Sequence, residues 1–173
     1  SVSKNAYTRR PFPGVSEFYK ALNRHGKDPV FYVSSSDWNL YELIRDFLNY
    51  RKIPPGVLLL KDLHVNLKNI FKSGGGSHQH KLEKVELLMD LFPGMQFVLI
   101  GDSGQHDPEI YAQVMADYPG RVKAVYIREI RRIKEQRRKL LKAKIQDPKA
   151  PDITFVQTTQ QALDHAKNHS IIP

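Results

Sequence analysis

The chain has 173 residues and a formal net charge of +9, and 40% of its residues are hydrophobic, 10% aromatic and 26% charged. This composition is typical of a globular domain with enough chain to bury a core; it contains neither the run of about eighteen apolar residues that a membrane helix needs nor an apolar stretch in residues 1–12 that would indicate a secretory signal. Because there is no cysteine, disulfides, thiolate zinc sites and a cysteine nucleophile are excluded.

Apolar strand-like runs alternate with amphipathic helices along the chain. In chain order the pattern predicts a helix over 13–25, a strand over 29–33, a helix over 38–51 capped by Ser36 or Asp37, a strand over 57–60, a helix over 79–92, a strand over 96–100, a helix over 108–117, a strand over 122–127, a helix over 129–145, a strand over 153–156 and a helix over 159–168. Continuous apolar strands separated by helices are typical of a parallel sheet covered on both faces. We therefore predict an α/β fold and a single domain over residues 1–173.

Two carboxylates follow the predicted strand 96–100, and ligand sites in parallel sheets lie at the carboxyl ends of the strands. Asp102 comes directly after Gly101, and Asp107 lies five residues later in the same loop. Magnesium binds a few carboxylates together with waters and phosphate oxygens, so both residues are candidate metal ligands. The alternative is that Asp102 caps the next helix and that Asp107 forms a turn with Pro108.

Three consecutive serines, Ser34, Ser35 and Ser36, follow the predicted strand 29–33. Hydroxyls and backbone N–H groups at the start of a helix can cradle a phosphate, and a helix cap with spare hydroxyls explains the same serines equally well. Lys81 stands near the start of the predicted helix 79–92, where the helix dipole disfavours a cation. A nearby anion would explain its position, and an ordinary solvated lysine is the alternative.

Several stretches of the sequence are distinctive. They are residues 8–15 (Thr-Arg-Arg-Pro-Phe-Pro-Gly-Val), 31–40 (Phe-Tyr-Val-Ser-Ser-Ser-Asp-Trp-Asn-Leu), 80–81 (His-Lys), 97–111 (Phe-Val-Leu-Ile-Gly-Asp-Ser-Gly-Gln-His-Asp-Pro-Glu-Ile-Tyr) and 126–128 (Tyr-Ile-Arg). Together they resemble the haloacid-dehalogenase-like superfamily of aspartate-nucleophile phosphatases and, within it, the actin-patch-type phosphatidate phosphatase family, which is related to the lipins. The resemblance covers most of residues 7–130 and implies a three-layer α/β/α Rossmann-like fold.

The resemblance also implies a role for each matching residue. Ser34 would hydrogen-bond the transferring phosphoryl group, and Lys81 would steady the negative charge of nucleophile and phosphate. Asp102 would hold Mg²⁺, with Asp107 as its companion. The implied chemistry is a double displacement, in which an aspartate attacks phosphorus and water then hydrolyses the aspartyl-phosphate, while the metal and the lysine offset the charge of the phosphate.

The sequence departs from the family pattern at the first motif. In the family a strand ending Asp-x-Asp supplies the nucleophile and the acid/base, and no Asp-x-Asp pair occurs in these 173 residues. That strand precedes the segment matched by residues 8–15 and lies between the strands that end at Ser34 and Gly101, which would otherwise carry unpaired backbone groups. We therefore expect it to lie before Ser1 or to come from elsewhere, and we expect no turnover by these residues alone.

The space available for a lid is also small. Only about twenty residues separate the predicted strand 57–60 from Lys81, too few for a large cap domain. An open site suits the headgroup of a lipid on a membrane surface or another large phosphorylated substrate.

The positive charge belongs to one segment, because residues 121–144 hold eleven Lys or Arg against Glu129 and Glu135, and the other residues are neutral overall. The predicted helix 129–145 is cationic apart from a thin apolar seam of Ile130, Ile133, Leu140, Leu141 and Ile145. A polybasic face gains about 1 kcal/mol per charge near an anionic bilayer, and a solvated helix with one packed seam is the alternative. Nucleic-acid binding is disfavoured, because no aromatic residues interleave with the basic ones.

The resemblance implies a magnesium-dependent phosphatase that acts on a phosphomonoester, with phosphatidate as the expected substrate and diacylglycerol as its product. The alternative is a non-catalytic module of the same fold that binds phosphate or anionic lipid. We expect a cytoplasmic protein, with peripheral contact to an anionic membrane through residues 129–145.

Overall fold

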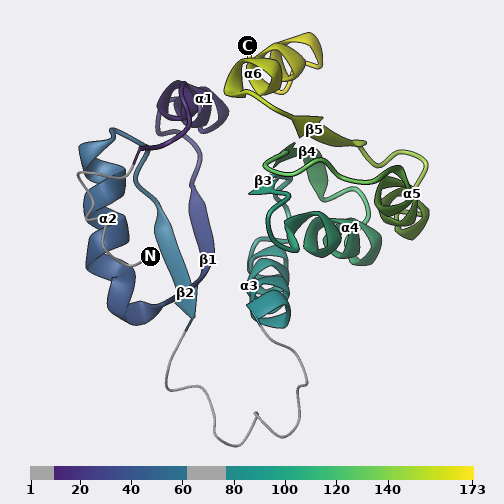
Figure 1. The fold of residues 1–173 in the computed structure, drawn as a ribbon, viewed down its shortest axis with the longest axis horizontal. Helices are drawn as coiled ribbons and strands as arrows, with labels where there is room; N and C mark the ends of the chain where they lie inside the picture. Colours follow the sequence, from purple (N-terminus) through teal and green to yellow (C-terminus); the bar gives the residue numbers. More distant parts are fainter. Residues whose placement is uncertain (1–9, 62–76) are drawn as a thin grey trace, which may run out of the picture. The chain divides into compact units, whose positions relative to one another are not determined.

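The computed structural model describes residues 10–61 and 77–173. Two compact units divide the chain, Ser1–Lys81 and Leu82–Pro173; that they form the single expected domain stays a prediction. In chain order the elements of Figure 1 are α1 (Val15–Leu22), β1 (Phe31–Asp37), the short 3₁₀ helix η1 (Trp38–Leu40), α2 (Tyr41–Tyr50), β2 (Val57–Lys61), α3 (Ser77–Leu91), β3 (Phe97–Asp102), α4 (Asp107–Asp117), β4 (Val122–Arg128), α5 (Glu135–Lys144), β5 (Ile153–Val156) and α6 (Thr159–Asn168).

Every strand pairing in the described ranges is parallel, which confirms the predicted α/β class. β1 pairs with β2, and β4 lies between β3 and β5. Because a helix connects each strand to the next, the arrangement is consistent with a Rossmann-like three-layer fold. Among the described residues β1 pairs only with β2, and β3 pairs only with β4. These are the two strands between which the Asp-x-Asp strand is expected, and that strand stays a prediction.

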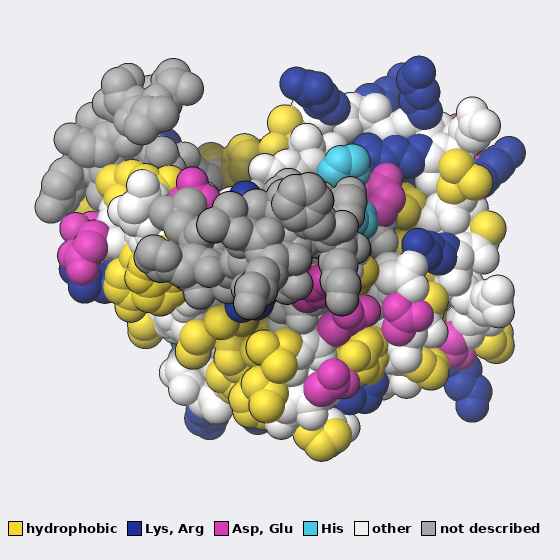
Figure 2. Space-filling model, turned by 90° about the horizontal axis from the view of Figure 1, so that it is seen from below, with side chains coloured by type: hydrophobic (Ala, Val, Ile, Leu, Met, Phe, Trp, Pro, Cys, Tyr) yellow, Lys and Arg dark blue, Asp and Glu magenta, His cyan; other side chains and the backbone are white. Residues whose placement is uncertain are grey.

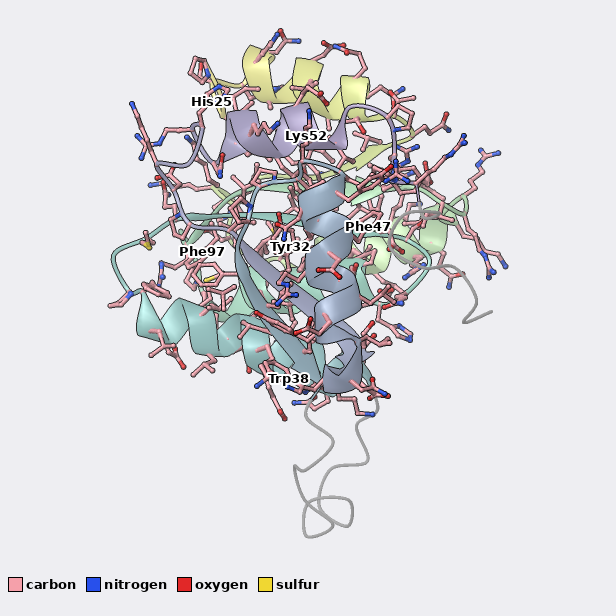
Figure 3. All side chains as sticks on the ribbon, turned by 90° about the vertical axis from the view of Figure 1, so that its left-hand side faces the viewer. His25, Tyr32, Trp38, Phe47, Lys52 and Phe97 are labelled. Carbon is pink, nitrogen blue, oxygen red and sulfur yellow. The ribbon has the colours of Figure 1, made fainter. Side chains whose placement is uncertain are left out.

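The core of the unit Ser1–Lys81 lies between α2 and the two-stranded sheet. Its buried residues are Leu48, Ile53, Leu58 and Leu60. Tyr32 from β1 and Phe47 from α2 pack against this core (Figure 3). The Tyr32 hydroxyl donates a hydrogen bond to the Pro54 carbonyl over 2.5 Å, and burial raises the pKa of Tyr32. The loop before β2 is thereby tied to β1.

The core of the unit Leu82–Pro173 is built around β4. Val125 and Ile127 on this strand are fully buried, as are Ala112 and Val114 on α4. Figure 1 shows α4 next to β3 and β4, and contacts join α4 to both strands and to α5. No helix of the described segments is long and apolar enough to cross a membrane.

The helix predicted over 129–145 is shorter than expected: α5 begins only at Glu135. The backbone N–H of Glu129 donates to the Val156 carbonyl over 2.8 Å, and the Ser103 hydroxyl bonds both backbone groups of Arg131. These tertiary bonds occupy groups that a helix would use for its own ladder. The predicted apolar seam is also divided: Ile133 and Leu141 are buried, whereas Ile130 and Leu140 are exposed.

Candidate functional site

The three serines lie inside β1 rather than after it, because the strand predicted over 29–33 extends to Asp37. The helical segment predicted from residue 38 begins there as the 3₁₀ helix η1 and continues as α2. The pairing of β1 with β2 joins Val33 to Leu59 and then Asp37 to Lys61, which leaves three residues on one strand opposite one on the other. The serines therefore form a bulge that interrupts the ladder. Asp37 stands at the N-cap position of the 3₁₀ helix, but neither this helix nor α2 has a side-chain cap hydrogen bond, so the predicted side-chain cap is wrong.

The hydroxyl of Ser34 has a local partner in this bulge. It accepts a hydrogen bond from the backbone N–H of Ser36 over 3.1 Å. The bulge places Ser34, Ser35 and Ser36 at the carboxyl end of β1 in partly buried positions. That these serines bind phosphate stays a prediction.

Lys81 lies on α3, whose first residue is Ser77. The helix begins two residues earlier than predicted, so Lys81 is one turn inside it, in a half-buried position. Its expected contact with an anion stays a prediction.

Asp102 is the last residue of β3, and its own loop organises its carboxylate. Its Oδ1 accepts the backbone N–H of Gly104 over 2.7 Å, the short-range bond typical of an aspartate-nucleated turn. The backbone N–H of Asp102 donates to Oδ2 of Asp107 over 3.0 Å. The residue at the N-cap of α4 is His106, with no side-chain cap, so the alternative that Asp102 caps this helix is wrong. The two predicted residues are in direct contact, because the Asp107 carboxylate accepts a hydrogen bond from the backbone of Asp102.

Gly101 makes this arrangement possible, and the sequence alone did not single it out. A Cβ at this position would lie 2.6 Å from both Cβ and Oδ2 of Asp107. Only glycine therefore lets the buried Asp107 side chain reach the backbone of Asp102. Asp107 also begins α4, where a carboxylate is favoured by the helix dipole, and Pro108 suits the first turn.

The donors at this strand end fit a magnesium ion held by few protein ligands. The Asp102 side chain is only partly buried, and the hydrogen bond from Gly104 uses one of its two oxygens. Magnesium accepts one or two carboxylates when waters and phosphate oxygens complete its shell. Across the described residues no group of three or more His, Cys, Asp or Glu could hold a metal ion, so a protein-only metal cage is not built here.

Ser103 joins the Asp102 loop to the segment after β4, a contact that the sequence did not reveal. Its hydroxyl donates to the Arg131 carbonyl over 3.0 Å and accepts the Arg131 N–H over 3.2 Å. Its own N–H donates to the Arg128 carbonyl over 2.9 Å. Because Ser103 is buried, these bonds fix the two loops against each other.

A second contact of this kind links α4 to α5. The guanidinium of Arg137 forms a two-pronged ion pair with Glu109 over 2.5 and 2.8 Å and also donates to the Gln105 carbonyl over 3.3 Å. Burial by itself would raise the pKa of Glu109, but the hydrogen bond and charge of Arg137 outweigh it, so the pKa is lowered. The partners are 28 residues apart, and no local spacing in the sequence indicates the pair.

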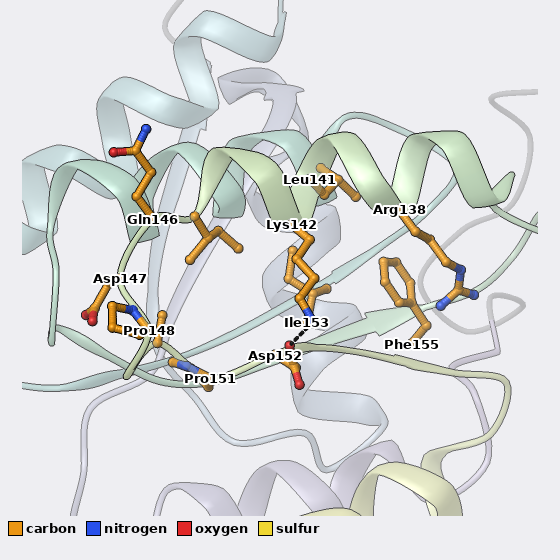
Figure 4. A pocket seen from close by; sticks show the side chains of 12 residues that line it. Arg138, Leu141, Lys142, Gln146, Asp147, Pro148, Pro151, Asp152, Ile153 and Phe155 are labelled. Atoms are coloured by element: carbon orange, nitrogen blue, oxygen red, sulfur yellow. Dashed lines mark ion pairs between the residues drawn. The ribbon is translucent and has the colours of Figure 1, made fainter.

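A groove of about 650 Å³ lies between α5 and β5 (Figure 4). Aliphatic side chains line it together with Arg138 and Lys142. Lys142 Nζ lies 3.9 Å from Asp152 Oδ1, and the Arg138 guanidinium lies 4.1 Å from the centre of the Phe155 ring. None of the predicted site residues lines this groove.

Comparison with known proteins gives three matches. The family model "Phosphatidate phosphatase APP1, catalytic domain" matches residues 1–129. The chain is 31% identical over 115 residues to phosphatidate phosphatase APP1 of Saccharomyces cerevisiae, and the match covers 66% of this chain and 19% of the relative. It is 28% identical over 119 residues to the uncharacterized protein C29B5.04c of Schizosaccharomyces pombe, with 68% of this chain and 19% of the relative covered.

The chain thus spans about a fifth of the length of either curated relative. No solved structure matches it. The family match includes every predicted site residue and ends at the start of the segment that follows β4.

Proposed function

Because the chain belongs to the family of the phosphatidate phosphatase APP1 catalytic domain, we propose that the protein is a magnesium-dependent phosphatase. Its substrate is a phosphomonoester, with phosphatidate as the substrate and diacylglycerol as the product that we favour. The yeast relative that supports this choice is itself named a phosphatidate phosphatase.

The observation that carries the proposal is the construction of the Asp102 loop. Gly101, Asp107 and Gly104 together hold one partly exposed carboxylate at the carboxyl end of β3, where parallel sheets bind ligands. A carboxylate held in this way is ready to bind a cation without reorganising its backbone. The loop therefore suits a reaction in which phosphate charge must be offset.

The remaining roles follow from the residue types. Asp102 would hold magnesium with Asp107 beside it, and the ion would offset charge on the phosphoryl oxygens. Ser34 would donate its hydroxyl to the phosphoryl group, with Ser35 and Ser36 in the same stretch. Lys81 would supply a second positive charge. The nucleophilic aspartate belongs to the expected Asp-x-Asp strand, so residues 1–173 by themselves are not expected to release phosphate.

A second candidate function is a module of the same fold that binds phosphate or anionic lipid without hydrolysing it. An Asp-x-Asp strand before Ser1 would favour the enzyme, and its absence there would favour this alternative. We also propose that the protein works in the cytoplasm, in peripheral contact with an anionic membrane through residues 129–145, where most of the surplus positive charge is found.

Phosphate release from phosphatidate vesicles by the natural full-length protein tests the proposal. Release should require magnesium and should fall about 100-fold or more in Asp102→Asn, because a metal ion contributes several kcal/mol of charge stabilisation. Asp152→Asn is the matched control, since this aspartate is exposed and makes only a long ion pair with Lys142; it should leave the rate unchanged.

A small phosphomonoester assayed in parallel separates substrate choice from chemistry. Phosphate release from that compound but not from phosphatidate would refute the proposal that the substrate is a lipid and would still support a phosphatase activity. If neither compound is hydrolysed at any magnesium concentration, the non-catalytic module is the correct account.

A further inference from the structure

The segment after β4 combines positive charge, an exposed aliphatic side chain and a fixed position beside the Asp102 loop. We define the docking loop as residues 130–134: Ile130, Arg131, Arg132, Ile133 and Lys134. We infer that the docking loop contacts an anionic lipid bilayer and holds the end of β3 at its surface. The inference rests on the proposed function, because a lipid phosphate has to be reached at a bilayer.

The docking loop lies directly beside the candidate metal ligand. Buried Ser103, the residue after Asp102, bonds both backbone groups of Arg131. The Ile130 Cδ1 atom lies 3.7 Å from the position that a Cβ on Gly104 would take, and Gly104 donates to the Asp102 carboxylate. A surface bound by this loop is therefore held next to Asp102.

Hydrogen bonds fix the backbone near both ends of the docking loop, so its exposed side chains keep their place at the surface. Ile133 is buried, and its N–H donates to Glu129 Oε1 over 2.9 Å. Glu129 itself is bonded through its N–H to Val156 at the end of β5. Between these anchors Ile130 has 54% of its surface exposed, while its Cδ1 end lies against the Asp102 loop.

The docking loop carries three unneutralised cations within four residues, and Lys139 and Lys144 on α5 are likewise exposed without an ion-pair partner among the described residues. Arg131, Arg132 and Lys134 are exposed, and within the described parts of the chain none of them has an ion-pair partner. The arginines on α5 differ, because Arg137 pairs with Glu109 and Arg138 with Glu129. On the face shown in Figure 2, Lys and Arg side chains protrude along the upper and right-hand margins.

This chemistry fits an anionic bilayer better than a nucleic acid. Cations near an anionic surface gain from the negative potential of the headgroups, and an exposed aliphatic side chain gains by entering the headgroup boundary. Single-stranded nucleic acid is bound through aromatic side chains that stack on bases, and the docking loop has none. Ile130 adds an exposed aliphatic side chain next to these cations, as Leu140 does on α5, and the headgroup boundary of a bilayer offers such a side chain a favourable contact.

Vesicle sedimentation of the natural full-length protein tests the inference. The vesicles contain phosphatidylcholine alone or phosphatidylcholine mixed with phosphatidylserine, an anionic lipid without a phosphomonoester. We expect binding only to the anionic vesicles. Binding should fall about 25-fold in Arg131→Gln/Arg132→Gln, at about fivefold for each cation, and about tenfold in Ile130→Ser.

Matched variants on α5 serve as controls, since the exposed Leu140 is of the same size as Ile130 and lies in the same basic segment. Leu140→Ser and Lys139→Gln/Lys142→Gln should each change binding less than twofold. If they weaken binding as much as the loop variants do, the outer face of α5 is the contact and the inference is overturned. It is also overturned if the loop variants bind vesicles normally but lose retention on single-stranded DNA.

Phosphate release from a water-soluble phosphomonoester separates this inference from the proposed function. The loop variants should keep that activity and lose release from phosphatidate vesicles. Vesicle binding that survives in the loop variants overturns the inference and leaves the phosphatase standing. Vesicle binding that depends on the loop in a protein that hydrolyses neither substrate upholds the contact and overturns the phosphatase.

Discussion

Replacing Gly101 by alanine perturbs the contact that places Asp102. The new Cβ would lie 2.6 Å from the Cβ and Oδ2 of Asp107, far inside van der Waals contact. The Cβ of Asp107 is held by the start of α4, so the side chain cannot avoid the methyl group by rotating. We expect Asp107 to move away and its hydrogen bond to the Asp102 N–H to break.

The size of the effect follows from these two changes. Overpacking a tight site costs about 1 to 3 kcal/mol, and losing a hydrogen bond to a charged acceptor costs about 1.5 to 3 kcal/mol. Alanine also makes the unfolded chain less flexible than glycine does, which stabilises the folded state by about 0.5 to 1 kcal/mol. Gly101→Ala should therefore lower the free energy of unfolding by about 2 to 5 kcal/mol and reduce phosphate release, because the Asp102 backbone is no longer held.

Urea unfolding followed by circular dichroism measures the change, with Gly94→Ala as the matched control. A Cβ on Gly94 meets no atom within 4 Å, so this variant should stay within about 0.5 kcal/mol of the parent protein. Asp107→Ala should cost less stability in the Gly101→Ala background than in the parent, because both changes remove the same contact. Equal stabilities of the two glycine variants would refute the reasoning.

Two further predictions concern stability. Arg137→Ala should lower the free energy of unfolding by about 1 to 3 kcal/mol at neutral pH, because Glu109 keeps its burial and loses its partner. The pKa of Glu109 is lowered in the folded state, so the stabilisation by this carboxylate is present above the unfolded-state pKa of about 4.3 and is lost as the pH falls through the folded-state pKa. Urea unfolding at several acidic pH values should therefore show a weaker dependence of the free energy of unfolding on pH in Arg137→Ala than in the parent protein. An unchanged pH dependence would contradict the prediction. Thr158→Ala should cost about 1 kcal/mol in the same assay, since Thr158 and Gln161 form a complete capping box at α6, and a value near zero would show that the cap contributes little.

Some elements could be predicted closely because their signals are local. The strand over 153–156 and the helix over 159–168 have the predicted bounds. Thr158 at the N-cap of this helix and Gln161 three residues later form a capping box, an interaction that depends only on neighbouring residues. The short Gly-Asp-Ser-Gly string at the end of β3 was likewise visible, because Asp102 bonds a residue only two positions away.

Other features depend on residues that are distant in the sequence. The start of α5 was predicted too early because the backbone of Arg131 is bonded by Ser103, 28 positions away. The strand end predicted at residue 33 was too early because pairing with β2 keeps β1 extended to Asp37. Intrinsic preferences cannot report such bonds, since they are made only when the strands are assembled.

The sequence by itself determined the α/β class, the family and the candidate residues at the strand ends, because periodicity and short motifs are written in neighbouring residues. Only the tertiary structure decided which cations of the basic segment are neutralised and which remain exposed. Arg137 and Arg138 form ion pairs with carboxylates, whereas Arg131, whose backbone is bonded by Ser103, is exposed without such a pair among the described residues. The carboxylate partners of Arg137 and Arg138 lie 28 and 9 positions away in the sequence, so only the packing of the folded chain distinguishes these paired cations from the ones that we assign to the bilayer.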